Sequence, residues 1–218
     1  MTVSLRGEVV SQGYGFLEAA RPLMDSVSFA GELGKTLTPW SGGLVQQLVP
    51  KATSTPNTYS GMYGLDSFPF HTDLAHWQRP PRYLMLRCLK GYIDVPTLLI
   101  DGKTLVSEIT ANVLLRAVVK PRRPQRGSIS LLRLYEVSSE GTRLRWDQTF
   151  LQPASKMGEV AFGKVAEWLG KEKPQYIRLK TPGDTLVVDN WRMLHARSPI
   201  PPGLEDRKIE RIYLESLD

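Results

Sequence analysis

The strongest constraint on this chain is a His-Thr-Asp tripeptide, His71 to Asp73, combined with a distant histidine, His195. His71 and Asp73 are two residues apart, so in an extended segment both side chains leave the same face. His195 follows Asp73 by 122 residues and must come from another strand. Two imidazoles and one carboxylate form the ligand set that holds a non-haem ferrous ion on one face and leaves three positions open.

Each of these residues also has an ordinary structural interpretation. His71 would serve as a hydrogen-bonded core histidine, Asp73 as the start of a turn, and His195 as part of the turn that follows an Asp-Asn-Trp run. A His-x-Asp motif arises often by chance. Its combination with His195 and with two later arginines, Arg207 and Arg211, is far more specific, because an arginine beyond the third ligand can anchor the acid of a co-substrate.

Composition indicates one ordinary globular domain. A chain of 218 residues is long enough to bury roughly 70 % of its unfolded surface, and 41 % hydrophobic and 23 % charged residues are typical values. Sixteen prolines and eighteen glycines favour short elements and frequent turns over a helical bundle. The single cysteine, Cys88, excludes an intramolecular disulfide and fits the reducing cytoplasm, with a buried apolar role.

Charge and hydropathy argue against membrane and nucleic-acid partners. The first fifteen residues lack a secretory signal, and no apolar stretch reaches the ~18 residues that a membrane span needs. Much of the net charge of +6 lies in the segment from Lys120 to Arg126, which lacks the aromatic residues that stack on single-stranded bases. We therefore expect a solvated basic loop there, and attraction of an anionic substrate or carrier stays open.

Hydrophobic periodicity predicts many short strands with a few helices. We expect helices over residues 15–33 (ended by Gly34), 103–119 and 155–171, the last with Ser155 as N-cap and Val160, Val165, Trp168 and Leu169 facing inward. We expect strands over residues 44–49 within Trp40–Pro50, and over 58–63, 82–89, 95–100, 128–137, 142–150, 176–179, 185–189 and 207–214. Residues 51–57 read as a loop, Asp101-Gly102 as a turn and residues 138–141 as a hairpin turn. This pattern favours a closed or sandwiched β core and excludes a doubly wound α/β sheet, and no glycine-rich phosphate loop is present.

Several motifs stand in a specific order along the chain. They are Phe70-His71-Thr72-Asp73, Pro80-Pro81-Arg82, Pro96-Thr97-Leu98-Leu99 with Asp101-Gly102, Asp189-Asn190-Trp191-Arg192-Met193-Leu194-His195, and Arg207-Lys208-Ile209-Glu210-Arg211. Together they resemble the taurine dioxygenase-like (TauD/TfdA) family of Fe(II)/2-oxoglutarate-dependent oxygenases. The resemblance spans about residues 44–214, and the N-terminal portion is shorter than is usual in that family.

The resemblance implies a mainly β fold with flanking helices, built on a double-stranded β-helix (a jelly-roll, cupin-like core) with the metal at one open end. It implies that His71, Asp73 and His195 are the iron ligands and catalytic residues. The expected organisation is a single domain over 1–218, with a helical N-terminal part at 1–40 and a jelly-roll core at 41–218 that carries helical insertions around 103–119 and 155–171.

The same resemblance assigns the co-substrate site. Arg207 matches the arginine that holds the far carboxylate of 2-oxoglutarate, Thr97 a threonine that shares this contact, and Arg211 an arginine that in some relatives meets the co-substrate or the substrate acid. A planar guanidinium binds a carboxylate through two parallel hydrogen bonds. On a strand, residues four apart point the same way, so Arg207 and Arg211 would face one cavity. The alternatives are a strand-face role for Thr97 and surface ion pairs for the arginines, with Glu205 or Asp206 as the partner of Arg207.

Neighbouring residues receive secondary assignments. His76, Trp77 and Arg79 are placed to line the pocket, with His76 outside the ligand set because that set is already complete. Trp77 and Trp191 are expected to pack rather than to bind substrate. Asn190 is expected to order the turn before His195 through local hydrogen bonds.

The predicted activity is that of a dioxygenase that uses Fe(II), 2-oxoglutarate and O2 to oxidise an unactivated C–H bond of a small molecule, with release of succinate and CO2. Asp73 favours hydroxylation, because related halogenases lack this carboxylate; desaturation, cyclisation and epoxidation stay open. The basic balance and Arg211 suggest a small acid or an amino-acid-like substrate, in secondary metabolism or catabolism. A homo-oligomer stays open, and a membrane partner is not expected. The alternatives are a nucleic-acid demethylase of the same chemistry, a non-catalytic jelly-roll binding protein and a zinc hydrolase.

Overall fold

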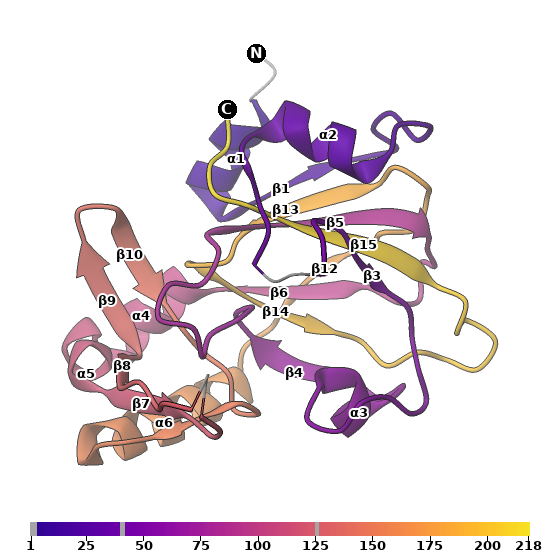
Figure 1. Cartoon of the computed structure of the whole chain (residues 1–218). Helices are drawn as coiled ribbons and strands as arrows, with labels where there is room; N and C mark the ends of the chain where they lie inside the picture. The colour runs from indigo at the N-terminus through magenta and orange to yellow at the C-terminus, as the bar shows by residue number, and fades with distance from the viewer. Residues whose placement is uncertain (1–3, 40–41, 125–126) are drawn as a thin grey trace.

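Two antiparallel sheets face each other in the computed structural model, which describes residues 4–39, 42–124 and 127–218 (Figure 1). The larger sheet has the strand order β1-β13-β5-β15-β2, with β3 also paired to β15. The second sheet has the order β12-β6-β14-β4. The strands of the larger sheet are β1 (Tyr14–Leu17), β13 (Thr185–Asp189), β5 (Tyr83–Lys90), β15 (Lys208–Leu214), β2 (Thr36–Leu37) and β3 (Gln46–Leu48). Those of the second sheet are β12 (Gln175–Ile177), β6 (Thr97–Asp101), β14 (Met193–Arg197) and β4 (Phe68–His71).

The predicted mainly β, jelly-roll architecture is confirmed. Apolar residues from both sheets form the core between them; among its members are Leu84, Leu86, Leu99, Leu186 and Val188. Strands β5 and β13 are buried along nearly their whole length, so their sequences are mostly apolar rather than alternating, with the buried Arg87 as an exception in β5. Burial of this core provides much of the driving force for bringing the two sheets together.

Helices α1 (Leu5–Gln12) and α2 (Ser26–Leu33) cover the outer face of the larger sheet, at the top of Figure 1. Val9 and Phe29 from these helices pack against Met85, Val187 and Ile212 on the sheet. These helices therefore bury the central part of the outer face of the large sheet.

A third unit packs beside the second sheet and contains helices and short strands (Figure 1). Its helices are α4 (Gly102–Ile109), α5 (Ala111–Arg116) and α6 (Lys156–Leu169). Its strands are β7 (Val118–Pro121), β8 (Leu132–Arg133), β9 (Tyr135–Ser138), β10 (Gly141–Leu144) and β11 (Leu151–Pro153). Ser155 caps α6 as predicted, and Val165 is buried, but Val160 is 41 % exposed and does not face inward as predicted.

The helix predicted over residues 15–33 is wrong for its first half. Residues 14–17 form the edge strand β1, and only α2 is helical, with Gly34 at its end as expected. Ala19 and Arg21 both have positive φ, and Arg21 precedes Pro22, which disfavours helical backbone at the residue before it. The apolar residues that suggested a helical face include Leu23, which is fully exposed.

The strand predicted over residues 58–63 is also wrong, because this segment forms the short helix α3 (Tyr59–Tyr63). The Thr58 hydroxyl accepts a hydrogen bond from the Gly61 N–H and caps the helix, so a capping residue outweighed the alternating pattern. The helix predicted over 103–119 is divided at Thr110, whose φ is 77°, and Asp101 caps α4 where a simple turn was predicted.

Other predicted strands are confirmed with shifted bounds. The segments predicted at 128–137 and 142–150 contain β8, β9 and β10, and β9 and β10 pair as the predicted hairpin. The Asp-Asn-Trp run leads directly into β14, which contains His195 and was not among the strands predicted from hydrophobic periodicity. Trp40, Gln125 and Arg126 lie outside the described residues. No helix in the described ranges is long and apolar enough to cross a membrane.

Candidate metal centre and cavity

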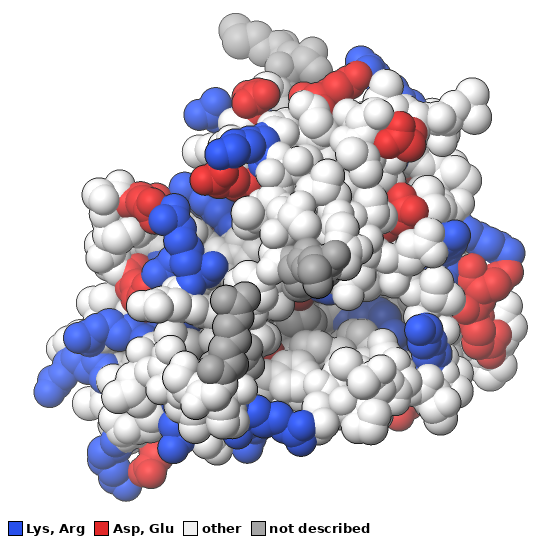
Figure 2. Space-filling model, viewed as in Figure 1, with Lys and Arg blue, Asp and Glu red and all other residues white. Residues whose placement is uncertain are grey.

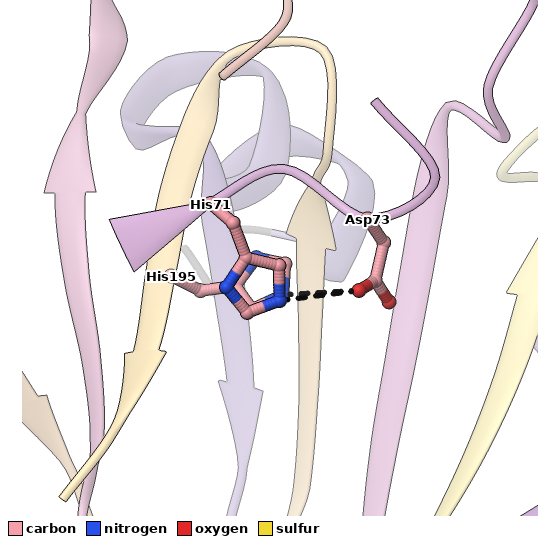
Figure 3. Close-up of side chains that lie close together, drawn as sticks. All are labelled: His71, Asp73 and His195. Atoms are coloured by element: carbon pink, nitrogen blue, oxygen red, sulfur yellow. Dashed lines mark ion pairs between the residues drawn. The ribbon is translucent and has the colours of Figure 1, made fainter. Parts of the chain in front are cut away.

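Two antiparallel strands bring the two histidines together. His71 ends β4, and His195 lies in the middle of β14, where the two residues are direct register partners. Their imidazole rings are 4.4 Å apart between centroids. Asp73 follows His71 after one residue, and Figure 3 shows both rings directed at its carboxylate. The expectation that His195 reaches the motif from another strand is confirmed.

The three side chains form a compact, buried cluster. One potential ligand atom from each residue lies within 4.8 Å of the others, and all three residues are buried. Asp73 Oδ1 is 3.4 Å from His71 Nε2 and 3.5 Å from His195 Nε2. A mixed set of two nitrogens and one oxygen at this spacing fits a divalent transition-metal ion.

The ring of His71 is held in an orientation that suits a ligand. Its Nδ1 is 2.8 Å from the carbonyl oxygen of Pro69, which accepts only, so Nδ1 carries the proton and donates it. Nε2, 3.4 Å from Asp73 Oδ1, is therefore the ring nitrogen left to bind a metal. Burial lowers the pKa of His71, but the hydrogen bond to Asp73 and the charge of that carboxylate outweigh it, so this pKa is raised. Tyr59 stacks on the same ring with centroids 4.3 Å apart, which limits its rotation.

Asp73 is ionised and held on its second oxygen. Oδ2 accepts hydrogen bonds from Arg211 Nη1 and from the Tyr213 hydroxyl, both at 2.8 Å. Burial opposes ionisation, but the charge of Arg211 and the bonds from both histidines hold the pKa of Asp73 well below its usual range. Burial and the nearby His71 lower the pKa of His195, so this ring is neutral. Asp73 thus contributes one negative charge, and its Oδ1 faces the two histidines, where a metal would bind.

Asn190 holds the backbone of Asp73. Its side-chain oxygen accepts from the Asp73 N–H at 2.7 Å, and its amide nitrogen donates to the carbonyls of Asp73 (3.0 Å) and Pro81 (2.9 Å). The prediction of purely local hydrogen bonds for Asn190 is therefore wrong. A buried amide finds its partners in whatever backbone lies beside it, and here the neighbouring backbone comes from 117 and 109 residues away.

The cluster opens into a cavity of about 690 Å³ between the two sheets. Thr97, Arg207 and Arg211 all line this cavity together with the three metal-centre residues. The even spacing of Arg207 and Arg211 predicted that these two face one cavity. Arg207 is only 5 % exposed, and its Nε is buried without a hydrogen-bond partner. Burial lowers the pKa of Arg207 to about 10. Among the described residues Arg207 makes no ion pair: Asp206, its suggested partner, pairs with Lys90 instead.

Arg211 differs from Arg207 because protein groups occupy its guanidinium. Besides the bond to Asp73, Nε of Arg211 donates to Gln46 Oε1 at 3.0 Å, and Nη2 donates to the same oxygen. Thr97 is buried on β6, opposite Arg197 on β14. Contacts of Thr97, Arg207 and Arg211 with a co-substrate stay predictions.

Further cavity residues escaped the sequence interpretation; those with charged or polar groups near the cluster are Gln46, Tyr59, Asp147, Arg197 and Tyr213. The sequence spacing could have identified two of these residues. Arg197 follows His195 by two residues and Tyr213 follows Arg211 by two, so the period of a strand places each on the same face as its neighbour. The others come from segments that the sequence does not connect to the motif. Asp147 is the bridge partner of His71, and its carboxylate accepts from the backbone N–H groups of Thr149 and Phe150.

The residues directly after the motif have different positions. His76 lines the cavity but lies outside the metal cluster, as predicted. Arg79 pairs with Glu140 at an exposed site instead of lining the cavity as predicted. Trp191 is buried and donates from Nε1 to the Pro80 carbonyl, in agreement with a packing role. Figure 2 shows basic side chains gathered around a hollow on this face of the molecule.

Comparison with known proteins supports these observations. No family model matches the chain. It is 26% identical over 162 residues to clavaminate synthase 2 of Streptomyces clavuligerus, a match that covers 67% of this chain and 49% of the relative. The structure resembles an asparagine oxygenase solved with Fe(II), 2S,3S-3-hydroxyasparagine and succinate (TM-score 0.65, 21% identity, 84% of this chain and 60% of that one). It also resembles PvcB of Pseudomonas aeruginosa, described as an Fe, alpha-ketoglutarate dependent oxygenase from an isonitrile synthetic pathway (TM-score 0.66, 16% identity, 96% and 78%).

The chain spans about half the length of the curated relative that it matches. The solved structures share the fold of this chain. These comparisons confirm the resemblance predicted from the ordered motifs: the chain is similar to clavaminate synthase 2 and has the fold of an Fe(II)-dependent oxygenase.

Proposed function

We propose that this protein is an Fe(II)- and 2-oxoglutarate-dependent oxygenase that hydroxylates a C–H bond of a small molecule and releases succinate and CO2. One observation carries the proposal: a buried two-histidine, one-carboxylate cluster shares a cavity with Arg207, a buried cation that has no acidic partner among the described residues. The first feature suits a ferrous ion, and the second suits the acid of a keto-acid co-substrate.

His71, Asp73 and His195 would hold the iron. Bound ferrous iron supplies the redox chemistry that couples decarboxylation of the keto acid by dioxygen to oxidation of a C–H bond. In the overall stoichiometry one oxygen atom of O2 enters succinate and the other enters the hydroxylated product. The protein's part is to hold Asp73 ionised and oriented through Arg211 and Tyr213, so that this carboxylate can bind a metal without first losing a proton.

Arg207 would bind the far carboxylate of 2-oxoglutarate, with the Thr97 hydroxyl as a second donor. The unpaired guanidinium of Arg207 is already desolvated in the ligand-free protein. An incoming carboxylate therefore gains a charge-assisted hydrogen bond without a further desolvation cost for Arg207. A cavity of about 690 Å³ lies within the usual size of ligand sites and has room for the keto acid and a small second molecule.

The substrate would be amino-acid-like. The cavity presents Asp147 as well as guanidinium groups, so its walls offer partners for both charges of a zwitterion. The similar asparagine oxygenase was solved with a hydroxylated amino acid, 2S,3S-3-hydroxyasparagine. We place the reaction in the reducing cytoplasm, which the single buried thiol of Cys88 suits.

The test is anaerobic loading with Fe(II), followed by exposure to O2 with 2-oxoglutarate and a panel of free amino acids that includes asparagine and arginine. Succinate release that a panel member stimulates, with a hydroxylated product in equal amount, is the expected result. A His71→Ala variant is the matched control and should release none. Hydrolytic activity with Zn²⁺ that needs neither keto acid nor O2 would instead support the zinc-hydrolase alternative, and stoichiometric keto-acid binding without turnover would support a binding protein.

A further inference from the structure

A second arginine lies in the part of the cavity that contains Arg207. Arg197 is in β14, two residues after His195, so both side chains leave the same face of the second sheet and line the cavity. On that sheet Arg197 is the direct register partner of Thr97 on β6 and of Phe68 on β4. All of these residues are cavity-lining, so Arg197 and Thr97 are adjacent on the wall that faces the ligand space.

The guanidinium of Arg197 is fixed but only partly used. Nη2 donates to the carbonyls of Gly64 at 2.9 Å and Asp66 at 2.5 Å, and the group lies 3.6 Å from the ring centroid of Phe68. These contacts orient the guanidinium plane. Nε of Arg197 and Nε of Arg207 are both buried without a hydrogen-bond partner. The two arginines line one cavity, and each thus has a buried N–H group without an acceptor.

Neither guanidinium is paired with a carboxylate among the described residues, although the charge of Asp66 acts on Arg197. No ion pair of either residue with another described residue is present, and the acids that line the cavity are engaged elsewhere: Asp73 by Arg211, and Asp147 by two backbone N–H groups. The positive charge of Arg207 also acts on Arg197. Like charges held together out of water raise the free energy of the protein unless an anion joins them.

We propose that Arg197 is a co-substrate-binding residue that shares the far carboxylate of 2-oxoglutarate with Arg207 and Thr97. This inference rests on the proposed function and adds a second cation to its acid site. A carboxylate has two oxygens and about four lone-pair directions, enough to accept from both guanidinium groups and the threonine hydroxyl together. The consequence is a strong preference for keto acids that end in a second carboxylate.

Binding of two keto acids of equal chain length isolates this contact. 2-Oxoglutarate and 2-oxopentanoate share the metal-chelating end, but only the former has the far carboxylate. With Mn(II)-loaded protein under anaerobic conditions, isothermal titration calorimetry should show that Arg197→Gln weakens 2-oxoglutarate binding by roughly 10- to 100-fold. The same variant should leave 2-oxopentanoate binding unchanged, and Arg197→Lys should have an intermediate preference.

Arg122→Gln is the matched control, because Arg122 also lines the cavity and donates to a backbone carbonyl, that of Gln148. It tests whether loss of any positive charge reduces the preference, and it should not change it. An equal loss of affinity for both keto acids in Arg197→Gln and in Arg197→Lys would mean a purely structural role and overturn the inference. An unchanged preference in either variant, with a wild type that binds 2-oxoglutarate, would overturn this inference alone. A wild type that binds neither keto acid would overturn the proposed function as well.

Discussion

The two ends of the cavity differ in how their charges are satisfied. At the metal end, Arg211 and Tyr213 both bond to Asp73, and Asn190 holds the Asp73 backbone. At the acid end, Arg197 and Arg207 keep buried N–H groups without acceptors. Both ends use arginines on strands that face the same space, so residue type alone does not separate them.

This difference separates arginines that hold a metal ligand in place from arginines that are available to bind an anion. A group that already has its protein partners serves to hold another residue in place, because binding a ligand would cost it those bonds. A buried group without partners is stabilised only when a ligand arrives. By this criterion Arg211 supports the proposed metal ligand Asp73, whereas Arg207 is available to bind an anionic ligand.

Substitution of the proposed metal ligands tests the metal end directly. His71→Ala and Asp73→Ala each remove one of the three donors, and changes in supporting residues alone typically cost about 10- to 100-fold in metal affinity. Each variant should therefore bind Fe(II) at least roughly 100-fold more weakly and lose turnover. Metal competition against a chromogenic chelator measures the affinity, with His76→Ala as the control because His76 lines the cavity outside the cluster. Wild-type iron affinity in either donor variant would refute the ligand assignment.

A matched pair of variants tests whether the two ends of the cavity differ in this way. Arg211→Met leaves the buried carboxylate of Asp73 without its cation and should lower the free energy of unfolding of the metal-free protein by about 3–5 kcal/mol. Arg207→Met removes a buried cation that lacks an ion-pair partner among the described residues, and should leave this free energy unchanged or raised.

Urea denaturation of the metal-free proteins measures both free energies. A divalent metal ion should reverse most of the loss in Arg211→Met, because the ion replaces the missing positive charge beside Asp73. Equal destabilisation by the two substitutions would show that the ends of the cavity do not differ in the way described.

The acid end should respond in co-substrate affinity instead. Arg207→Met is expected to weaken 2-oxoglutarate binding by about 2–5 kcal/mol, or roughly 30- to 5000-fold, because one partner of a buried charge pair is lost. The affinity of the metal itself should not change. Titration of the Mn(II)-loaded protein with 2-oxoglutarate measures the effect, and an unaltered dissociation constant would shift the co-substrate role to Arg211 or Arg197.

Sequence analysis predicted the parts of this site that depend on short-range periodicity and on ordered motifs. His71 and Asp73 share a face because of their spacing, and Arg207 and Arg211 share one for the same reason. The sequence did not predict the contacts that residues from distant segments make in the cavity. The bonds from Asn190 to Asp73 and from Arg211 to Gln46 join positions separated by more than 100 residues, and tertiary packing alone determines them.

The errors in the fold have the same physical origin. Residues 14–17 and 58–63 each contain a weak periodic pattern that fits the wrong element. An edge position beside β13 made the first a strand, and the Thr58 cap made the second a helix. Strongly apolar segments such as β5 were predicted well, because burial on both faces leaves little choice of structure.

A smaller loss in the free energy of unfolding is expected for a substitution of Tyr213, which shares Asp73 Oδ2 with Arg211. Tyr213→Phe keeps the buried ring and removes one hydrogen bond to a charged acceptor, so the free energy of unfolding should fall by about 1.5–3 kcal/mol, less than for Arg211→Met. Because both donors act on one oxygen, their losses should not add, and the double variant Arg211→Met/Tyr213→Phe measures the coupling. Tyr176→Phe, at an exposed position, is the control and should change nothing. Strict additivity of the two losses would mean that Arg211 and Tyr213 do not act together in holding Asp73, and the metal end would then be no more preorganised than the acid end.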